Sequence, residues 1–429
     1  MRSAPEDPTT DRPHRPAPSV GTAAAVGAGA FLATGAALTT AARVMARMPL
    51  VPSTSPLAAP DLEVVAAGAD ALVLRESVEA ARPGVLALRQ DGGSVHVRLG
   101  EIAERPAEDL VRRPLLAQDT PRPAHAGPAH SNGFFWAGDP RSAHGLEFQE
   151  IDVHSPVGPM PAWLVPAGDG ARWAVLVHGH GATRGEGLRS LPLLHALGIT
   201  ALVITYRNDL GAPPSVDRLH HLGSAEWEDC SAAIEAALER GARSVVLMGW
   251  SMGGGIALRT ARLSPHRDRI EALVLDSPAI DWRQILQHHA AQVRAPHAVR
   301  RGAMWMMGSV AGARMVQLHD PIALHEMTVE TYRESLAQPT LLLHAGADTT
   351  VPLDASRRLA DARPDLVEYH EVDGATHTRE WNVDPAVWER TVARFLIEHL
   401  QLPVDPQSLP LPVRDPAAAP QEGATGRRL

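Results

Sequence analysis

The sequence contains no lysine and a single cysteine. All 40 basic residues are arginines, so the chain cannot carry the lysine of a phosphate-loop ATPase, of a protein kinase or of a pyridoxal Schiff base. Cys230 has no partner for an intramolecular disulfide, and its inward position on a predicted helix indicates a small core residue. The net charge of −9 argues against a nucleic-acid partner.

Hydrophobic residues make up 45% of the 429 residues and charged residues 21%, which is typical of a globular protein with two or three folded units. Residues 20–42 contain no charged side chain, and this stretch is long enough to cross a bilayer. We expect a single-pass N-terminal membrane anchor, with a cleaved signal peptide as the alternative. Arginines flank the stretch on both sides and leave its orientation nearly balanced. As for most N-terminal signal anchors, we expect the following domain outside the cytoplasm.

The stretch 245–258 organises the rest of the chain. Its aliphatic run ends at the motif G-W-S-M-G, residues 249–253, and an apolar helical pattern begins at once, so Ser251 is predicted on a strand-to-helix turn. Small residues are needed there because such a turn holds the serine in a strained backbone conformation. The first N–H groups of the helix would face any negative charge that forms beside Ser251. The pattern therefore predicts a nucleophilic serine.

This turn resembles the nucleophile elbow of the α/β-hydrolases, in which an acid and then a histidine follow the serine, each after a later strand. A buried-type strand at 339–345 leads into a turn that ends on Asp348, and a strand at 366–372 precedes a loop that carries His377. The resemblance implies that Ser251, Asp348 and His377 form a catalytic triad. Asp276, at the end of an earlier strand, is the alternative acid.

The predicted strand at 173–177 ends in the motif H-G-H-G. In α/β-hydrolases the residue after such an H-G pair supplies one N–H of the oxyanion hole, so the resemblance assigns one donor to His180 and the other to Met252. The alternative is that His178 and His180 bind a metal, but no third ligand at zinc-type spacing accompanies them. We therefore expect neither a metal nor a cofactor.

The resemblance covers residues 145–400 and is greatest for the Bem46-like and prolyl-oligopeptidase-like serine hydrolases. It implies an α/β-hydrolase fold, with a mostly parallel central sheet flanked by helices, and hydrolysis of an ester or thioester through an acyl-enzyme. The serine at the elbow, where dehalogenases and epoxide hydrolases carry aspartate, excludes those two activities. A serine peptidase of the prolyl-oligopeptidase type and a catalytically silent, membrane-tethered scaffold remain as alternatives.

Residues 281–338 are predicted to form interrupted helices at the place where this family inserts a cap over the active site. Met304, Trp305, Met306 and Met307 make part of the insertion apolar, which suits a small hydrophobic acyl substrate; ordinary helix packing is the alternative. Upstream, residues 61–119 contain short strands and a hairpin turn. They predict a β-rich module too short to be a propeller.

The sequence therefore predicts a series of segments. They are a disordered tail at 1–19, a transmembrane signal anchor at 20–42, a linker at 43–60, the β-rich module at 61–119, a second linker at 120–140, the hydrolase domain at 141–402 with its cap insertion at 281–338, and a disordered tail at 403–429.

Overall fold

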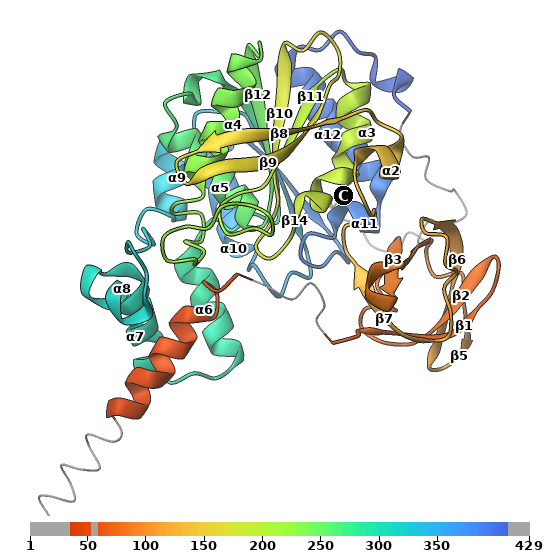
Figure 1. Ribbon diagram of the computed structural model, residues 1–429, viewed down its shortest axis with the longest axis horizontal. Helices are drawn as coiled ribbons and strands as arrows, with labels where there is room; N and C mark the ends of the chain where they lie inside the picture. Colours follow the sequence, from red (N-terminus) through yellow and green to blue (C-terminus); the bar gives the residue numbers. More distant parts are fainter. Residues whose placement is uncertain (1–34, 53–58, 411–429) are drawn as a thin grey trace, which may run out of the picture.

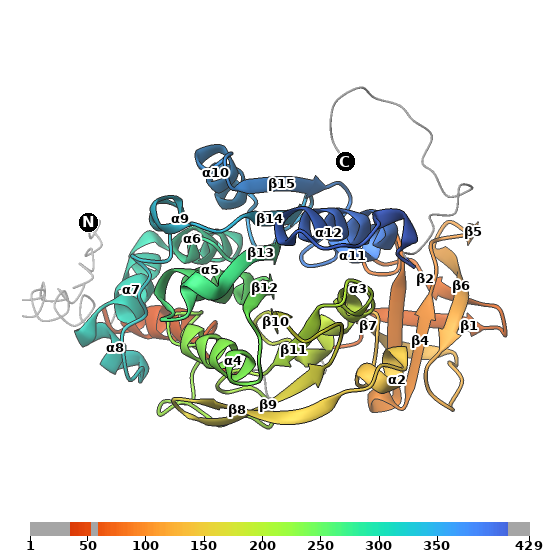
Figure 2. The same ribbon diagram turned by 90° about the horizontal axis from the view of Figure 1, so that it is seen from above.

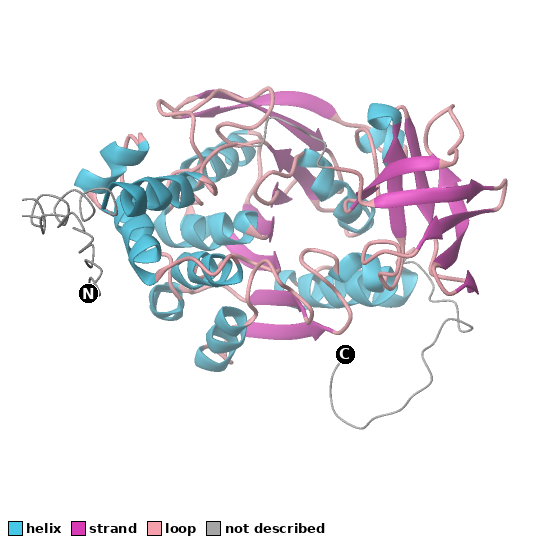
Figure 3. Cartoon of the chain, turned by 90° about the horizontal axis from the view of Figure 1, so that it is seen from below, coloured by secondary structure: helices cyan, strands magenta, loops and turns pink. Residues whose placement is uncertain are grey.

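The computed structural model describes residues 35–52 and 59–410. These residues form a large α/β domain, a small β module beside it, and an N-terminal helix that projects from the opposite end of the large domain (Figure 1). Figure 3 shows how helices surround the strands of the large domain, whereas strands dominate the small one. The predicted α/β architecture and the preceding β-rich module are thus confirmed.

The large domain is built on an eight-stranded sheet with the order β15-β14-β13-β12-β10-β11-β9-β8. Neighbouring strands from β10 to β15 pair in parallel, whereas β9 is antiparallel to both β11 and β8. β11, β12 and β14 are buried at every position, as parallel strands covered on both faces require. The strands are β8 (Gln149–Ser155), β9 (Gly158–Val165), β10 (Arg172–Val177), β11 (Thr200–Ile204), β12 (Ser244–Trp250), β13 (Ile270–Asp276), β14 (Thr340–Ala345) and β15 (Val367–Val372).

Helices cover both faces of this sheet (Figure 2). One hydrophobic cluster includes side chains of α4 (Trp227–Glu239), α5 (Met252–Leu263) and α10 (Asp354–Ala362). The other lies on the opposite face and includes side chains of α3 (Leu191–Ala196) and α12 (Pro385–Leu400). The remaining helical elements of this domain that bear on the site are α2 (Pro140–His144), η2 (Arg184–Ser190) and α11 (Glu380–Val383).

The predicted cap insertion at 281–338 forms helices. They are α6 (Trp282–Gln292), α7 (His297–Gly308), α8 (Val310–Val316) and α9 (Val329–Ser335). Met306 and Met307 are buried in the hydrophobic core, so for these two residues ordinary helix packing is the better interpretation. Met304 and Trp305 instead line a pocket.

The β module is a closed barrel, because β2 pairs with both β1 and β6. Its strands are β1 (Leu62–Ala67), β2 (Ala71–Arg75), β3 (Leu86–Gln90), β4 (Val95–Leu99), β5 (Glu104–Ala107), β6 (Leu110–Gln118) and β7 (Gly127–Asn132). β7 lies within residues 120–140, which the sequence predicts as a linker, so that boundary is wrong. Its sequence G-P-A-H-S-N has little strand propensity, and only pairing with β1 and β3 makes it a strand.

The N-terminal helix occupies residues 35–47 and is exposed over 35–41. Ala42, Ala46 and Leu50 are buried against the large domain, so the predicted linker at 43–60 begins as packed structure. Most of the predicted membrane span at 20–42 lies outside the described residues. Within 35–52 and 59–410, no helix combines the length and the apolar character that crossing a bilayer requires.

The C-terminal boundary also differs from the prediction. Val404 and Leu409 pack partly against the hydrophobic core, although the sequence predicts a disordered tail from residue 403 onward. A short 3-10 helix, η4 (Pro406–Ser408), lies between them. The predicted tail over 411–429 and the one over 1–19 fall outside the described residues.

We expect the buried carboxyl group of Glu389 in α12 to make the free energy of unfolding depend on pH. Burial raises the pKa of its carboxyl group to about 7, above the ordinary value of 4.5, although the Trp381 indole N–H donates to it at 3.0 Å. Because the pKa is higher in the folded state, the folded chain favours the neutral carboxyl group. The free energy of unfolding is therefore highest below pH 4.5 and falls as the pH rises to about 7. Glu389→Gln keeps the acceptor and removes the charge. It should raise the free energy of unfolding at pH 8.5 by on the order of 1–3 kcal/mol and change it little at pH 5.

Thermal unfolding at the two pH values measures this difference. Glu398→Gln is the matched control, because Glu398 lies on the same helix with 65% of its side chain exposed, and it should shift the midpoint little at either pH. An equal effect of Glu389→Gln at both pH values would contradict the assigned cause.

Candidate active site

Ser251 occupies a sharp turn between β12 and α5, with φ 52° and ψ −118°. This conformation is strained for a residue with a side chain. Gly249 and Gly253 are required because neighbouring backbone atoms lie too close to them for a side chain. A Cβ atom on Gly253 would lie 2.0 Å from the carbonyl oxygen of Val177, and one on Gly249 would lie 2.4 Å from that of Gly253. The turn therefore packs directly on the end of β10.

The predicted triad residues lie in one hydrogen-bonded row. His377 Nε2 is 2.8 Å from Ser251 Oγ, and His377 Nδ1 is 2.6 Å from Asp348 Oδ2. Ser251 follows β12, Asp348 follows β14 and His377 follows β15, so the carboxyl edge of the parallel sheet brings them together. With Nδ1–H donating to the carboxylate, Nε2 is free to accept the serine proton.

Asp348 is held as a carboxylate. Its Oδ1 accepts hydrogen bonds from the N–H groups of Thr350 and Val351, both at 2.8 Å, and its side chain is fully buried. Burial opposes ionisation, but hydrogen bonds from His344 and His377 outweigh it and hold the pKa of Asp348 well below its usual range. Sequence reasoning missed His344, whose only signal is a histidine inside an otherwise apolar strand.

The alternative acid, Asp276, contacts other groups. Its Oδ2 accepts from the Trp388 indole N–H at 3.0 Å, and its main-chain carbonyl accepts from the Ser251 N–H at 2.9 Å. Burial and then the neighbouring Asp276 carboxyl raise the pKa of Glu380 well above its ordinary value, as expected where two buried carboxyl groups share one proton. Asp276 thus supports the serine turn from behind.

The two predicted oxyanion donors come from two segments that meet at Ser251, the start of α5 and the loop after β10. Met252 is the first residue of α5, so its N–H has no partner within the helix. His180 lies in the loop after β10, which passes so close to the serine that a Cβ atom on Gly179 would be 3.2 Å from that of Ser251. The His180 imidazole Nε2 is turned away, 2.9 Å from the Pro49 carbonyl oxygen.

His178 contacts the side chains of Asp209 and Tyr206. Its Nε2 is 2.8 Å from Asp209 Oδ2, and its ring stacks on Tyr206 at 4.4 Å between centroids. Burial alone would lower the pKa of His178, but the Asp209 carboxylate outweighs burial and holds the pKa above its ordinary value. Across the described residues, no three or more His, Cys, Asp or Glu side chains are grouped so that they could hold a metal ion.

A model described as "Alpha/beta hydrolase family" matches residues 174–391, just over half of the chain. The chain belongs to the alpha/beta hydrolase family. A second model, described as "Domain of unknown function (DUF8805)", matches residues 63–131, which correspond to the barrel. Among curated proteins, none matches this hydrolase.

Solved structures that resemble this hydrolase include an esterase, a peptidase and a lipase. The esterase Pf2001 of Pyrococcus furiosus is 17% identical, with 61% of this chain and 96% of that chain covered and a TM-score of 0.48. A puromycin-hydrolyzing peptidase of Mycobacterium tuberculosis is 17% identical, covering 83% and 55%, with a TM-score of 0.47. A monoacylglycerol lipase of Paleococcus ferrophilus is 19% identical, covering 56% and 99%, with a TM-score of 0.40. These similarities concern the fold alone, and the Bem46-like or prolyl-oligopeptidase-like assignment stays a prediction.

A buried ion pair ties together the two loops of the hydrolase that flank the serine. Glu186 in η2 accepts the Gly179 N–H at 2.7 Å and lies 3.5 Å from the Arg189 guanidinium. Arg189 in turn donates to the Thr378 carbonyl at 2.9 Å, next to His377. This pair was not predicted from the sequence, where its only signal is two opposite charges three residues apart.

The barrel also contacts the loop that carries His377. The Val85 N–H donates to the Asn382 carbonyl at 2.8 Å, and Arg82 donates to the Thr376 hydroxyl. A Cβ atom on Gly84 would lie 2.0 Å from the same Asn382 oxygen, so the two domains meet without a gap there. Figure 1 shows the barrel beside α11. The position of His377 therefore depends on both domains.

The geometry predicts that the two aspartates differ in their effect on hydrolysis. Asp348→Asn should reduce kcat toward a p-nitrophenyl ester by about 10³ to 10⁴-fold, because the amide favours the wrong imidazole tautomer of His377. Asp276→Asn should cost far less, because Asp276 contacts Trp388 and Glu380. Steady-state kinetics of both variants, with circular dichroism as the folding control, measures this. The opposite ranking would show that Asp276 is the acid.

Proposed function

We propose that this chain is a serine hydrolase that cleaves a carboxylic ester or thioester with a hydrophobic acyl group. The observation that carries the proposal is the row Ser251, His377 and Asp348, with hydrogen bonds of 2.8 and 2.6 Å. A nucleophile, a base within reach of it and a carboxylate that orients the base are the parts that acyl transfer requires. Membership of the alpha/beta hydrolase family supports a hydrolytic reaction.

In the proposed mechanism, His377 Nε2 takes the proton of Ser251 as the serine oxygen attacks the substrate carbonyl carbon. Asp348 stabilises the resulting imidazolium, and the N–H groups of Met252 and His180 stabilise the oxyanion. The tetrahedral intermediate collapses, and His377 gives its proton to the departing alcohol or thiol. Water then attacks the acyl-enzyme, with His377 again as base, and the released acid leaves Ser251 protonated.

Two alternatives are less well supported. A prolyl-oligopeptidase type of enzyme limits access with a propeller, whereas the module that precedes this hydrolase domain is a barrel of short strands over residues 62–132. A silent scaffold would have no need of a strained serine with a histidine 2.8 Å from its hydroxyl, because strain of this kind is kept at functional sites. Esters are therefore the preferred substrates in this proposal.

Covalent labelling tests the proposed nucleophile. A fluorophosphonate probe should label the purified wild-type chain at Ser251, and Ser251→Ala should not be labelled. Ser251→Ala and His377→Ala should each lose ester hydrolysis by about 10⁵ to 10⁶-fold, and the double variant should be little worse, because the groups act as a unit.

The same preparations compare the substrate classes. We expect kcat/KM for short p-nitrophenyl esters to exceed that for an aminoacyl-proline amide. A wild-type chain that stays unlabelled and inactive while folded would favour the scaffold. A higher kcat/KM for the amide would favour the peptidase.

We further propose that the hydrolase is anchored to a membrane by residues 20–42, with the catalytic domain outside the cytoplasm. The charge-free sequence of this stretch and the exposed surface of helix 35–41 support the proposal. The full chain should be released from membranes by detergent and not by alkaline carbonate. Protease added to spheroplasts should digest the domain. Protection until the membrane is broken would reverse the orientation, and a fully soluble chain would refute the anchor.

A further inference from the structure

Two segments far apart in the sequence share an unusual charge pattern. Between Trp282 and His319 there is no Asp or Glu, although the chain as a whole has a net charge of −9. The same stretch contains arginines at 283, 294, 300, 301 and 314. Residues 35–52 likewise contain arginines at 43 and 47 and no acidic side chain. Both segments are therefore purely basic within an acidic protein.

The fold brings these two segments together. A Cβ atom on Gly302 of α7 would lie 3.0 Å from that of Ala42, so helix 35–47 packs directly on α7. Arg47 donates to the Val316 carbonyl at 2.5 Å and to the Gln317 side chain at 2.9 Å. Helix 35–47, α6, α7 and α8 form one end of the molecule, which we call the cap end (Figure 1).

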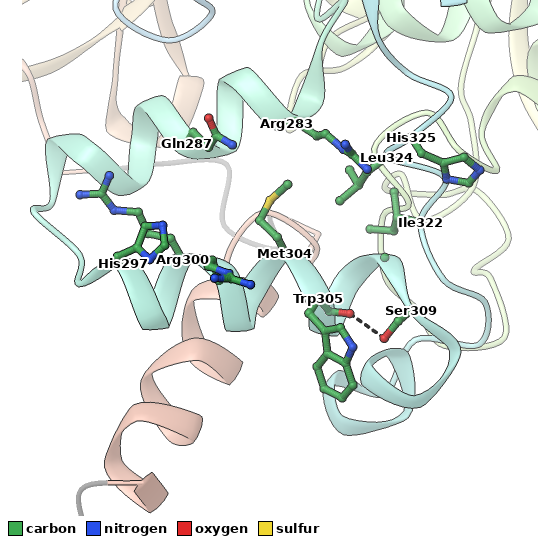
Figure 4. A pocket seen from close by; sticks show the side chains of 12 residues that line it. Arg283, Gln287, His297, Arg300, Met304, Trp305, Ser309, Ile322, Leu324 and His325 are labelled. Carbon is green, nitrogen blue, oxygen red and sulfur yellow. Dashed lines mark hydrogen bonds between the residues drawn. The ribbon is translucent and has the colours of Figure 1, made fainter.

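The cap end contains a pocket of about 760 Å³ between α6, α7 and the segment that follows α8. Figure 4 shows its arginines and histidines interleaved with apolar side chains. Its lining comprises Arg283, Gln287, His297, Arg300, Arg301, Met304, Trp305, Gly308, Ser309, Ile322, Leu324 and His325. The lining includes no carboxylate and no residue of the triad.

The guanidinium groups of this pocket form no ion pair within the described residues, although the lining His325 lies 3.8 Å from Glu326. Arg283 and Arg301 form no ion pair with any described residue. Arg300 donates a hydrogen bond from Nε to the Ala295 carbonyl at 2.7 Å. Glu326, next in sequence to the lining, is engaged with Arg259 and Arg262 at 3.2 and 3.0 Å. An anionic group would therefore find guanidinium donors that no carboxylate of the described chain already occupies.

The apolar part of the lining decides what kind of anion fits. Met304, Ile322 and Leu324 offer dispersion contacts, and Trp305, at 49% exposed, has the amphipathic ring that is enriched at membrane interfaces. A free phosphate would use only the guanidinium groups, whereas a phosphate with an acyl chain uses both kinds of side chain. The volume suits such a ligand. The neighbouring helix 35–47 continues the charge-free stretch 20–42 in the sequence.

We propose that this pocket binds the phosphate headgroup of an anionic phospholipid and so holds the cap end against the membrane surface. Arg300 and Arg301 of α7 bind the phosphate, Arg283 adds positive charge from the facing wall of α6, and Met304 and Trp305 contact the first part of an acyl chain. The placement of the pocket at a bilayer rests on the proposed anchor. The binding chemistry does not, because it uses described residues alone.

The test is a titration of the full-length Ser251→Ala chain, in a neutral detergent, with a short-chain phosphatidylglycerol, a short-chain phosphatidylcholine or inorganic phosphate. Calorimetry should detect saturable binding of phosphatidylglycerol and at least tenfold weaker binding of the other two. Arg300→Gln with Arg301→Gln should weaken that binding by about 25-fold, or about fivefold for each arginine. Arg283→Gln, on the other wall of the pocket, should weaken it by about fivefold on its own.

Arg314→Gln is the matched control, because Arg314 lies exposed on the cap end but outside the pocket lining, and it should leave the affinity within twofold. Equal loss in the control, equal binding of the two lipids, or equally tight binding of inorganic phosphate would each overturn the proposal. The Ser251→Ala background prevents turnover of the lipid, so an inactive hydrolase would not alter the result. A chain that fractionates as soluble would refute the anchor without affecting this titration.

Discussion

The site depends on one steric constraint, the contact of α5 with β10 at Gly253. With the Gly253 Cα so near the Val177 carbonyl that a Cβ atom would lie 2.0 Å from it, the helix can start only where Ser251 makes its sharp turn. That turn raises the serine side chain above the carboxyl edge of the sheet and leaves the first N–H groups of α5 beside it. The Asp276 carbonyl then fixes the Ser251 N–H from the neighbouring strand, so the strain is held by regular structure on two sides.

The loop that carries His377 is held by a different kind of contact. Arg189 reaches it from η2, Arg82 and Val85 reach it from the barrel, and Glu380 lies buried next to Asp276 beneath it. The contacts of Arg189, Arg82 and Val85 each satisfy a main-chain or hydroxyl oxygen of the chain around His377. A histidine that must accept one proton and donate another needs such support, because a small displacement would break the 2.8 Å contact with Ser251. The barrel thus acts as structural support for the hydrolase domain.

The N-terminal segment connects the membrane proposal with the site. Helix 35–47 packs on the cap, and the residues after it continue inward, where the Pro49 carbonyl contacts the His180 imidazole and the Leu50 carbonyl accepts the His220 N–H at 2.7 Å. Leu50 is fully buried. The same few residues therefore link the surface that carries the basic pocket to the loop beside Ser251.

The sequence alone determined most of the elements and their order, because strand, turn and helix signals depend on neighbours a few residues apart. The G-W-S-M-G turn, the strands before Asp348 and His377, and a hairpin within residues 61–119 were all predicted in this way. Whether His377 pairs with Asp348 or Asp276, that β7 is a strand, and that Arg82, Glu186 and Arg189 support the site were decided only by the tertiary structure. Each of these depends on partners tens to hundreds of residues away, such as the bond from Arg189 to Thr378. A local sequence pattern does not indicate which distant backbone carbonyl will need a hydrogen-bond donor. Only the folded chain brings that carbonyl and its donor together.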